Sequence, residues 1–125
     1  MAGLGSHVRI IADRKRPLPA PPPIVWADLT TPDSDGPRAW LRLLPDEVAP
    51  EITAWLEPRL VTWSSLWTRH PDLVIRLDCQ PDGAGTRLHV VIEAPDDAPD
   101  GAWIGHVRHR INKLLFRDLR YSYGQ

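Results

Sequence analysis

The feature that most constrains the fold is a long amphipathic segment in the last part of the chain. Asp100 is a residue type that caps helices, because its side chain accepts hydrogen bonds from the free N–H groups of the first turn. The helix after it is predicted to run to about Tyr121. Its apolar residues recur at spacings of three and four, the period of one helical face: Ile104, Val107, Ile111, Leu114, Leu115 and Leu119. A helix with one apolar face has to lie against another layer, and we expect that layer to be a sheet.

Two runs just before this helix alternate between apolar and polar residues, as a strand does when one of its faces is buried. The residues expected on the buried face are Leu73, Ile75, Leu77, Cys79, Thr86, Leu88, Val90 and Ile92. The link between the runs, residues 81–85, contains two glycines that can supply the positive φ angles of a hairpin turn. The two runs are therefore predicted to form an antiparallel hairpin with one buried and one solvated face.

Earlier parts of the chain also contain runs typical of strands, separated by short links that hold Pro, Asp or Gly. The first is expected to be an edge strand that continues into an extended proline segment ending at Pro23, because proline is tolerated at sheet edges. The predicted strands are residues 8–12, 48–56, 60–68, 73–79 and 86–94. Links this short favour antiparallel neighbours and a sheet of about five or six strands.

Two short helices are expected between the first and second strands. Residues 24–29 show helical spacing, and Pro22 and Pro23 are well placed for a first helical turn. Residues 31–37 hold two prolines, two aspartates and a glycine, so the chain is predicted to turn there. Residues 38–44 are predicted to form the second short helix or a turn.

The composition is consistent with one soluble domain. A chain of 125 residues can bury roughly two thirds of its unfolded surface, and we expect residues 8–125 to form a single domain after a flexible segment at residues 1–7. The formal net charge of −1 gives no reason to expect nucleic acid as a partner. Cys79 is the only cysteine, which excludes an intrachain disulfide. No run reaches the roughly 20 apolar residues needed to span a bilayer, and no secretory signal is apparent, so a cytoplasmic location without membrane insertion is expected.

The order of these elements resembles the helix-grip fold of the START-like or SRPBCC superfamily, in a shortened form. Three local patterns carry the resemblance. Residues 19–30 are similar to the family's turn into its first helix, residues 57–63 to the opening of a strand in the middle of its sheet, and residues 85–88 to its last strand after a hairpin. The resemblance implies an α+β domain in which the long C-terminal helix lies across an antiparallel sheet.

The resemblance also implies a cavity between the sheet and the last helix. Members of the superfamily hold lipids, sterols, polyketides or other apolar molecules there, and some are cyclases or aromatases. This chain departs from the pattern in two ways: it has room for fewer strands than the usual seven or so, and Val90 stands where relatives often carry an aromatic residue. A valine at that position is expected to leave space facing the helix.

The candidate ligand-binding residues combine tryptophans, a hydroxyl group and the apolar faces of the sheet and helix. Six tryptophans are many for this length; they can pack the core, or Trp40, Trp63 and Trp67 can form an aromatic wall for a ligand. The hydroxyl of Ser65 can orient a ligand or bond to the main chain. The complete predicted set is Trp40, Trp63, Ser65, Trp67, Ile75, Leu77, Leu88, Val90, Ile104, Val107, Arg108, Ile111 and Leu115.

Arg108 is included because it is next to Val107 on the helix and, if it points inward, can bind a ligand carboxylate with two hydrogen bonds. The alternative is an exposed arginine paired with an acidic residue. The other basic residues of the helix fall mostly outside its apolar stripe: Arg110, Lys113, Arg117 and Arg120.

His106 and His109 are three residues apart on the predicted helix and are weak candidates for a catalytic base. The same spacing can bring two imidazoles to one metal ion, but no third ligand lies nearby in the sequence, so neither a metal site nor another cofactor is expected.

Three functions stay open on this evidence. The first is the binding of a small hydrophobic or aromatic ligand between the sheet and the C-terminal helix. The second is a cyclase or aromatase that acts on a polyketide-like chain, which requires an inward acid or base. The third is a homodimeric interaction module without a ligand, because a shortened sheet leaves an edge that has to be covered.

Overall fold

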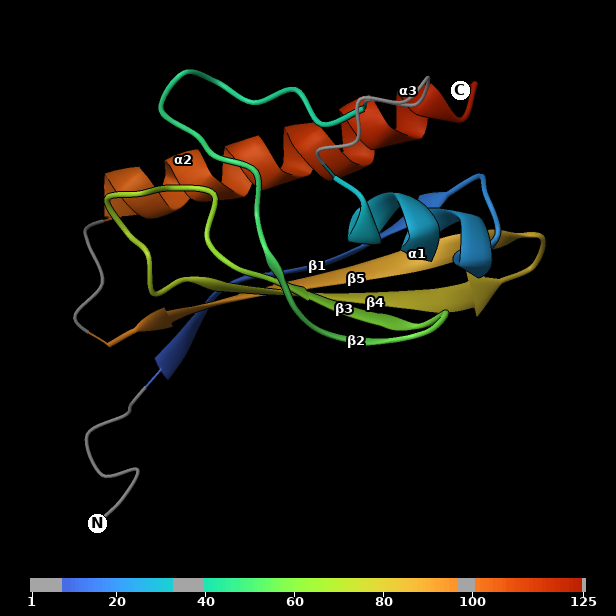
Figure 1. The fold of residues 1–125 in the computed structure, drawn as a ribbon, viewed down its shortest axis with the longest axis horizontal. Helices are drawn as coiled ribbons and strands as arrows, with labels where there is room; N and C mark the ends of the chain where they lie inside the picture. The colour runs from blue at the N-terminus through green and yellow to red at the C-terminus, as the bar shows by residue number, and fades with distance from the viewer. Residues whose placement is uncertain (1–7, 33–39, 97–100, 125) are drawn as a thin grey trace, which may run out of the picture.

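The structure, a computed structural model, describes residues 8–32, 40–96 and 101–124. Five strands form one antiparallel sheet in the spatial order β1-β5-β4-β3-β2, and the long C-terminal helix lies over one face of it with α1 on the same side (Figure 1). The strands are β1 (Val8–Leu18), β2 (Ile52–Leu56), β3 (Leu60–Trp63), β4 (Val74–Asp82) and β5 (Gly85–Pro95). The predicted α+β helix-grip architecture is confirmed, with five strands.

The hairpin predicted from alternation is formed by β4 and β5, which pair from Val74 and Glu93 to Asp82 and Gly85. All eight residues expected on its inner face are buried. The turn has Gly83 at φ 60°, a conformation that favours glycine. Gly85 serves a different need: a Cβ atom there would lie 2.5 Å from the carbonyl oxygen of Leu18, so the close approach of β1 requires a glycine.

Strand β1 is longer than expected, because it continues through Arg16 and Pro17 and pairs with β5 as far as Leu18. The position of β1 at the sheet edge explains this result, since a proline there removes no hydrogen bond to a second neighbour. A register shift between Ile10 and Ala12 bends the strand near its start.

Strands β2 and β3 are shorter than predicted, and the residues on either side of them hydrogen-bond through serine side chains. The hydroxyl of Ser64 accepts a hydrogen bond from the main-chain N–H of Glu51 at 2.8 Å, and that of Ser65 accepts one from Trp67 at 3.0 Å. The bond between Ser65 and Trp67 is local, and local side-chain bonds of this kind compete with the strand ladder. The predictions of strands over residues 48–56 and 60–68 were therefore correct in place but wrong in extent.

The first short helix is confirmed as α1 (Pro22–Thr30), with prolines in its first turn. The second is not formed: residues 40–44 are irregular, and residues 38 and 39 lie outside the described part of the chain. Side chains bind the main chain in this segment, because Arg110 donates to the carbonyl of Arg42 and the carboxylate of Glu47 accepts from the N–H of Leu44. Pro45 further disfavours helical geometry at the residue before it.

The long final helix is confirmed, but it is not α-helical throughout. It consists of α2 (Gly101–Lys113), a π-helical segment η1 (Leu114–Leu119) and α3 (Arg120–Ser122). Twelve residues at about 100° each overshoot three turns by about 120°, so in an unbroken α-helix Leu119 would be rotated toward the margin of the face that holds Val107. The π-helical turn is wider and rotates the chain less for each residue, so it brings Leu119 back toward the side of Val107. Both residues are fully buried. The predicted cap, Asp100, lies outside the described residues.

Candidate ligand-binding site

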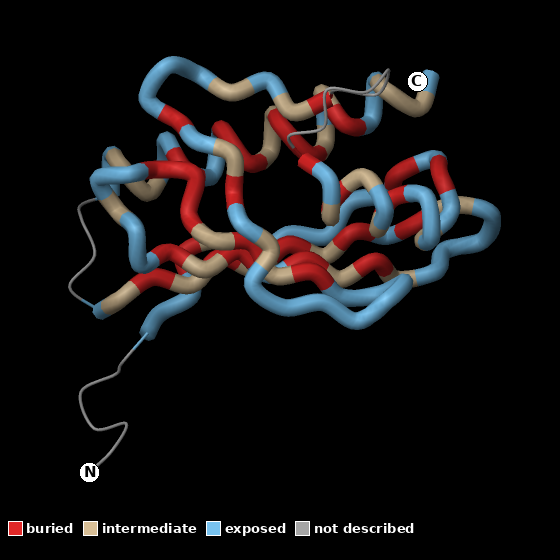
Figure 2. The backbone as a smooth tube through the Cα atoms, in the orientation of Figure 1, coloured by how far each residue is buried: buried red, intermediate tan, exposed pale blue. Residues whose placement is uncertain are grey.

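Both the sheet and the helix contain many buried residues (Figure 2), and side chains fill the middle of the space between these two layers. Trp40 and Trp63 stack there, with ring centroids 6.2 Å apart and planes at 22°. The indole N–H of Trp63 donates to the carbonyl of Leu29 at 2.8 Å, and that of Trp40 to the carbonyl of Asp28 at 3.3 Å. Because both donors bind the end of α1, these two tryptophans join α1 to the core at this point.

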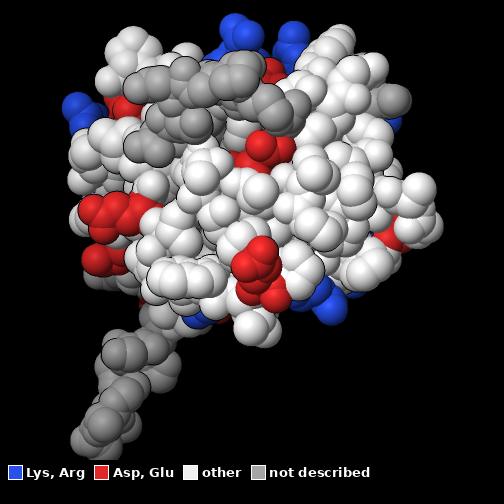
Figure 3. All heavy atoms as spheres, turned by 45° about the vertical axis from the view of Figure 1, so that its right-hand side comes forward, with Lys and Arg blue, Asp and Glu red and all other residues white. Residues whose placement is uncertain are grey.

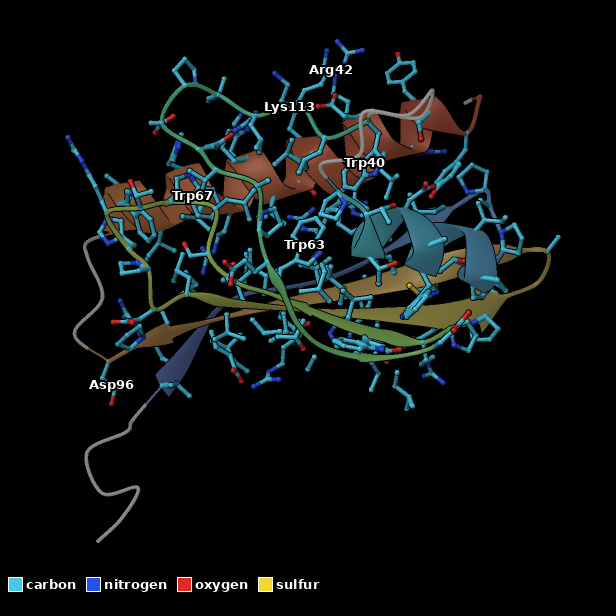
Figure 4. All side chains as sticks on the ribbon, in the orientation of Figure 1. Trp40, Arg42, Trp63, Trp67, Asp96 and Lys113 are labelled. Carbon is cyan, nitrogen blue, oxygen red and sulfur yellow. The ribbon has the colours of Figure 1, made fainter. Side chains whose placement is uncertain are left out.

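The third predicted tryptophan, Trp67, is also buried and packs edge-on against Trp103 with centroids 6.1 Å apart. Ser65 is buried beside it, and its hydroxyl lies 3.2 Å from the carbonyl oxygen of Trp67 while it accepts the Trp67 N–H. The Ser65 hydroxyl is thus used within its own turn. Figure 4 shows the three labelled tryptophans, Trp40, Trp63 and Trp67, between the sheet and the helix.

Most of the predicted apolar residues belong to this packed core. Five of them are at most 1% exposed and line none of the grooves that the structure describes: Ile75, Leu77, Leu88, Val107 and Leu115. Ile104 is partly buried against the same core. The layer in which the resemblance implied a cavity is thus largely filled by side chains.

Space for a ligand is found to one side, between β1 and the final helix. We call this hollow, which has a volume of about 490 Å³, the β1 groove. The volume lies within the range of small-molecule sites. Its lining residues are Ile10, Ile11, Ala12, Asp13, Arg14, Val90, Arg108, His109, Ile111, Asn112 and Phe116. Of the predicted ligand residues, Val90, Arg108 and Ile111 are brought together here.

Among the polar side chains of the helix that line this groove, Arg108 and Asn112 have hydrogen-bonding groups that can serve a ligand. Arg108 donates through Nε to the main-chain carbonyl of Ile11, which joins the helix to β1 and leaves the two terminal nitrogens of the guanidinium. The carbonyl oxygen of Asn112 is buried, and no hydrogen bond to it is present within the described residues. A buried acceptor without a partner costs roughly 1–3 kcal/mol. Asn112 was missed in the sequence because its position on the helix is intermediate between the two faces.

Only one of the two candidate histidines lines the β1 groove. His109 lines the β1 groove, whereas His106 is exposed and lines none of the described grooves. The cyclase hypothesis therefore depends on His109 alone. Over residues 8–32, 40–96 and 101–124 no three His, Cys, Asp or Glu side chains form a group that could hold a metal ion.

A buried ion pair between the helix and the segment before β2 was not predicted. Arg110 donates to Glu47 through two nitrogens, at 2.7 and 2.8 Å, and the exposed fractions of the two side chains are 5% and 0%. Burial alone raises the pKa of Glu47, but the hydrogen bonds from Arg110 and the N–H of Leu44 outweigh it and hold the pKa below its ordinary value. The hydrogen bond to Glu47 also raises the pKa of Arg110. The sequence did contain a signal, since Arg110 is three residues after Val107 and four before Leu114.

Comparison with solved structures supports the fold. The chain is similar to the crystal structure of CalU16 from Micromonospora echinospora, with 19% identity, a TM-score of 0.61 and 88% and 82% of the two chains covered. It is also similar to the Aha1 dimer from Colwellia psychrerythraea, with 13% identity, a TM-score of 0.60 and coverage of 86% and 91%. For Ara h 8.0201 the values are 14%, 0.58, 95% and 100%. No family model and no curated protein matches the chain.

These structures have the same fold as this chain, so the predicted helix-grip fold is confirmed. Identities this low show the fold alone. In the described part of the chain, no helix combines the length and apolar character needed to cross a membrane.

Proposed function

We propose that the protein binds a small, largely apolar ligand in the β1 groove. The observation that carries the proposal is the combination of groove size, an apolar lining from Val90, Ile111 and Phe116, and the buried unpaired oxygen of Asn112. A ligand that covers this lining gains about 25 cal/mol for each Å² of apolar surface removed from water. The site keeps the predicted location between sheet and helix, displaced toward the edge at β1.

The polar groups restrict the chemistry of the ligand. A hydroxyl or N–H donor next to Asn112 would satisfy the buried oxygen, and a carbonyl or carboxylate oxygen next to Arg108 would accept from its terminal nitrogens. Both side chains lie on the same helix, four residues apart, so one small molecule can contact both. An apolar body with one oxygen-bearing end fits this arrangement.

A substitution that fills the groove tests the proposal. Ala12→Phe places a large side chain in the groove wall, and Ala54→Phe is its control, because Ala54 is exposed on the edge strand at the opposite side of the sheet. We expect the fluorescence increase of 1-anilinonaphthalene-8-sulfonate, and its displacement by fatty and aromatic acids, to be lost in Ala12→Phe and retained in Ala54→Phe. Equal binding by both variants would contradict the assignment.

A homodimer formed through β2 is the second candidate. The side chains of Trp55 and Leu56 are 65% and 61% exposed on this edge strand, and β2 contains no charged residue. The other edge, β1, has charges such as Lys15 and a proline that oppose strand pairing. One similar structure is described as a dimer.

The dimer is tested by light scattering over a concentration series. We expect the native chain to shift toward twice the monomer mass as concentration rises, and Trp55→Lys to stay monomeric. A native chain of constant monomer mass at all concentrations would rule this candidate out.

A further inference from the structure

We propose that a second groove, on the flank of the final helix that faces residues 40–44, binds an acidic peptide segment. This groove has a volume of about 600 Å³ and shares no lining residue with the β1 groove. One wall carries Arg42 and Leu44, and the other carries Lys113, Arg117 and Tyr121. We call it the basic groove.

Charge is the first argument. Arg42, Lys113 and Arg117 form no ion pair within the described residues, whereas arginines on the outer face of the sheet are paired, as in Arg76 with Glu93 at 3.0 Å. Arg110 at the floor is already neutralised by Glu47. Three unpaired cations against one carboxylate, Asp118, leave a net charge of +2 in the lining.

This surplus positive charge attracts anions. Figure 4 shows the labelled Arg42 and Lys113 side chains projecting from the outer side of the segment and the helix, and Figure 3 shows Lys and Arg atoms along the same upper rim. An adjoining hollow of about 240 Å³ adds Arg120 next to Arg117 and Tyr121. The basic residues therefore continue along the last turns of the helix.

Spacing is the second argument, and it favours an extended peptide. Lys113 and Arg117 are four residues apart across the π-helical segment η1, close to one helical turn, so both line the same wall of the groove. Alternate side chains of an extended chain are separated by roughly 6.6 Å. Two acidic residues separated by one other residue can thus meet both cations on one side of the peptide.

The exposed apolar surface supports the same occupant. Leu44 is 40% exposed and Tyr121 is 67% exposed, so an apolar side chain of the peptide can contact either of them between the charges. A single phosphate would leave these side chains uncovered. A flat bilayer would contact only the rim of a concave site, so a peptide fits better than a membrane surface.

The groove is also held in place before binding. Trp40, which lines it, stacks on Trp63 in the core. Arg110 bonds to the carbonyl of Arg42 at 3.1 Å and to Glu47, so it fixes the wall formed by residues 42–44 against the helix. Less ordering is then needed when a peptide binds, which favours affinity.

The test uses fluorescence anisotropy with a labelled peptide of alternating Asp and Leu, and its Asn and Leu counterpart. Lys113→Glu combined with Arg117→Glu reverses the two cations of the helix wall. Lys15→Glu combined with Arg16→Glu is the control, because both residues are exposed on β1 and the change in net charge is the same. We expect at least tenfold weaker binding of the acidic peptide by the groove variant, and less than twofold change in the control.

Equal weakening in both variants would overturn the proposal, because net charge alone would then explain binding. Equal affinity for the Asn and Leu peptide, or no binding of the acidic peptide at low ionic strength, would also overturn it. Binding of the native chain, but not of the groove variant, to phosphatidylserine vesicles, without binding of the peptide by the native chain, would assign the basic residues to a membrane surface instead. Thermal unfolding curves of the two variants establish that both are folded.

Discussion

Arg110 and Glu47 form a bidentate ion pair that is almost completely removed from solvent, and it joins the final helix to the segment that precedes β2. The residues are 63 positions apart in the sequence. A buried pair of this kind contributes less to stability than its Coulomb attraction indicates, because both charges lose their hydration. Its main effect is to fix which parts of the chain lie together.

Removal of one partner is therefore expected to be much more harmful than removal of both. Arg110→Leu leaves a buried carboxylate and should lower the free energy of unfolding by about 3–5 kcal/mol. The double variant Arg110→Leu with Glu47→Leu should recover a large part of that loss. Urea denaturation measures both values, and Arg76→Ala, at an exposed pair, should change stability by less than about 1 kcal/mol. A double variant no more stable than the single one would contradict this account.

The pair also predicts how stability depends on pH. The pKa of Glu47 is lower in the folded protein than its ordinary value of 4.5, so its contribution is complete above that value and is lost as the pH falls through the folded pKa. The native chain should lose stability below about pH 4.5 relative to the variant in which both partners are leucine. Parallel curves for the two proteins from neutral to acidic pH would show that Glu47 has no such role.

Cys79 should be chemically inert in the folded protein. Burial, followed by the negative charge of Asp78, raises the pKa of its thiol to about 12, and only the thiolate is an efficient nucleophile. Iodoacetamide at mildly alkaline pH is expected to leave the native chain unmodified and to alkylate it in denaturant, as measured by mass spectrometry. Rapid modification without denaturant would show that the thiol is accessible.

Trp63 is predicted to be structural. Trp63→Ala removes a fully buried side chain, its stacking on Trp40 and its bond to Leu29, and should cost about 3–5 kcal/mol. Trp55→Ala on the exposed edge should change stability by less than about 0.5 kcal/mol in the monomer. Thermal and urea unfolding check both, and a Trp63 variant as stable as the Trp55 variant would support the aromatic-wall hypothesis again.

Local patterns in the sequence predicted the strands and the helix whose apolar residues repeat at one regular spacing. The alternation of apolar and polar residues around Ile75 and Leu88 predicted the β4–β5 hairpin. The spacing of three and four residues between apolar positions from Val107 to Leu119 predicted the final helix. The predictions failed where a long-range partner decides the outcome. Residues 40–44 are irregular because Arg110 and Glu47 bind their main chain, and no local pattern shows that contact.

The residues of the candidate site were predicted only in part, because local patterns in the sequence do not show long-range contacts. Val90, Arg108 and Ile111 were predicted to contact a ligand between sheet and helix, and in the structure all three line the β1 groove. Trp63 and Ser65 were assigned to the ligand because periodicity shows which face a side chain is on, but not whether another side chain already fills the space. Asn112 contributes a buried carbonyl oxygen without a hydrogen-bond partner, and only the structure shows that this oxygen is buried.

The most direct test of ligand binding in the β1 groove is an NMR titration of the isotope-labelled chain with a fatty or aromatic acid that displaces the fluorescent probe. We expect the largest amide shifts to fall on Ile11, Asn112 and their neighbours in β1 and α2, and the Asn112 side-chain amide to shift with them. Shifts centred on Trp63 and β3, or no saturable shifts with any acid of the panel, would contradict this expectation.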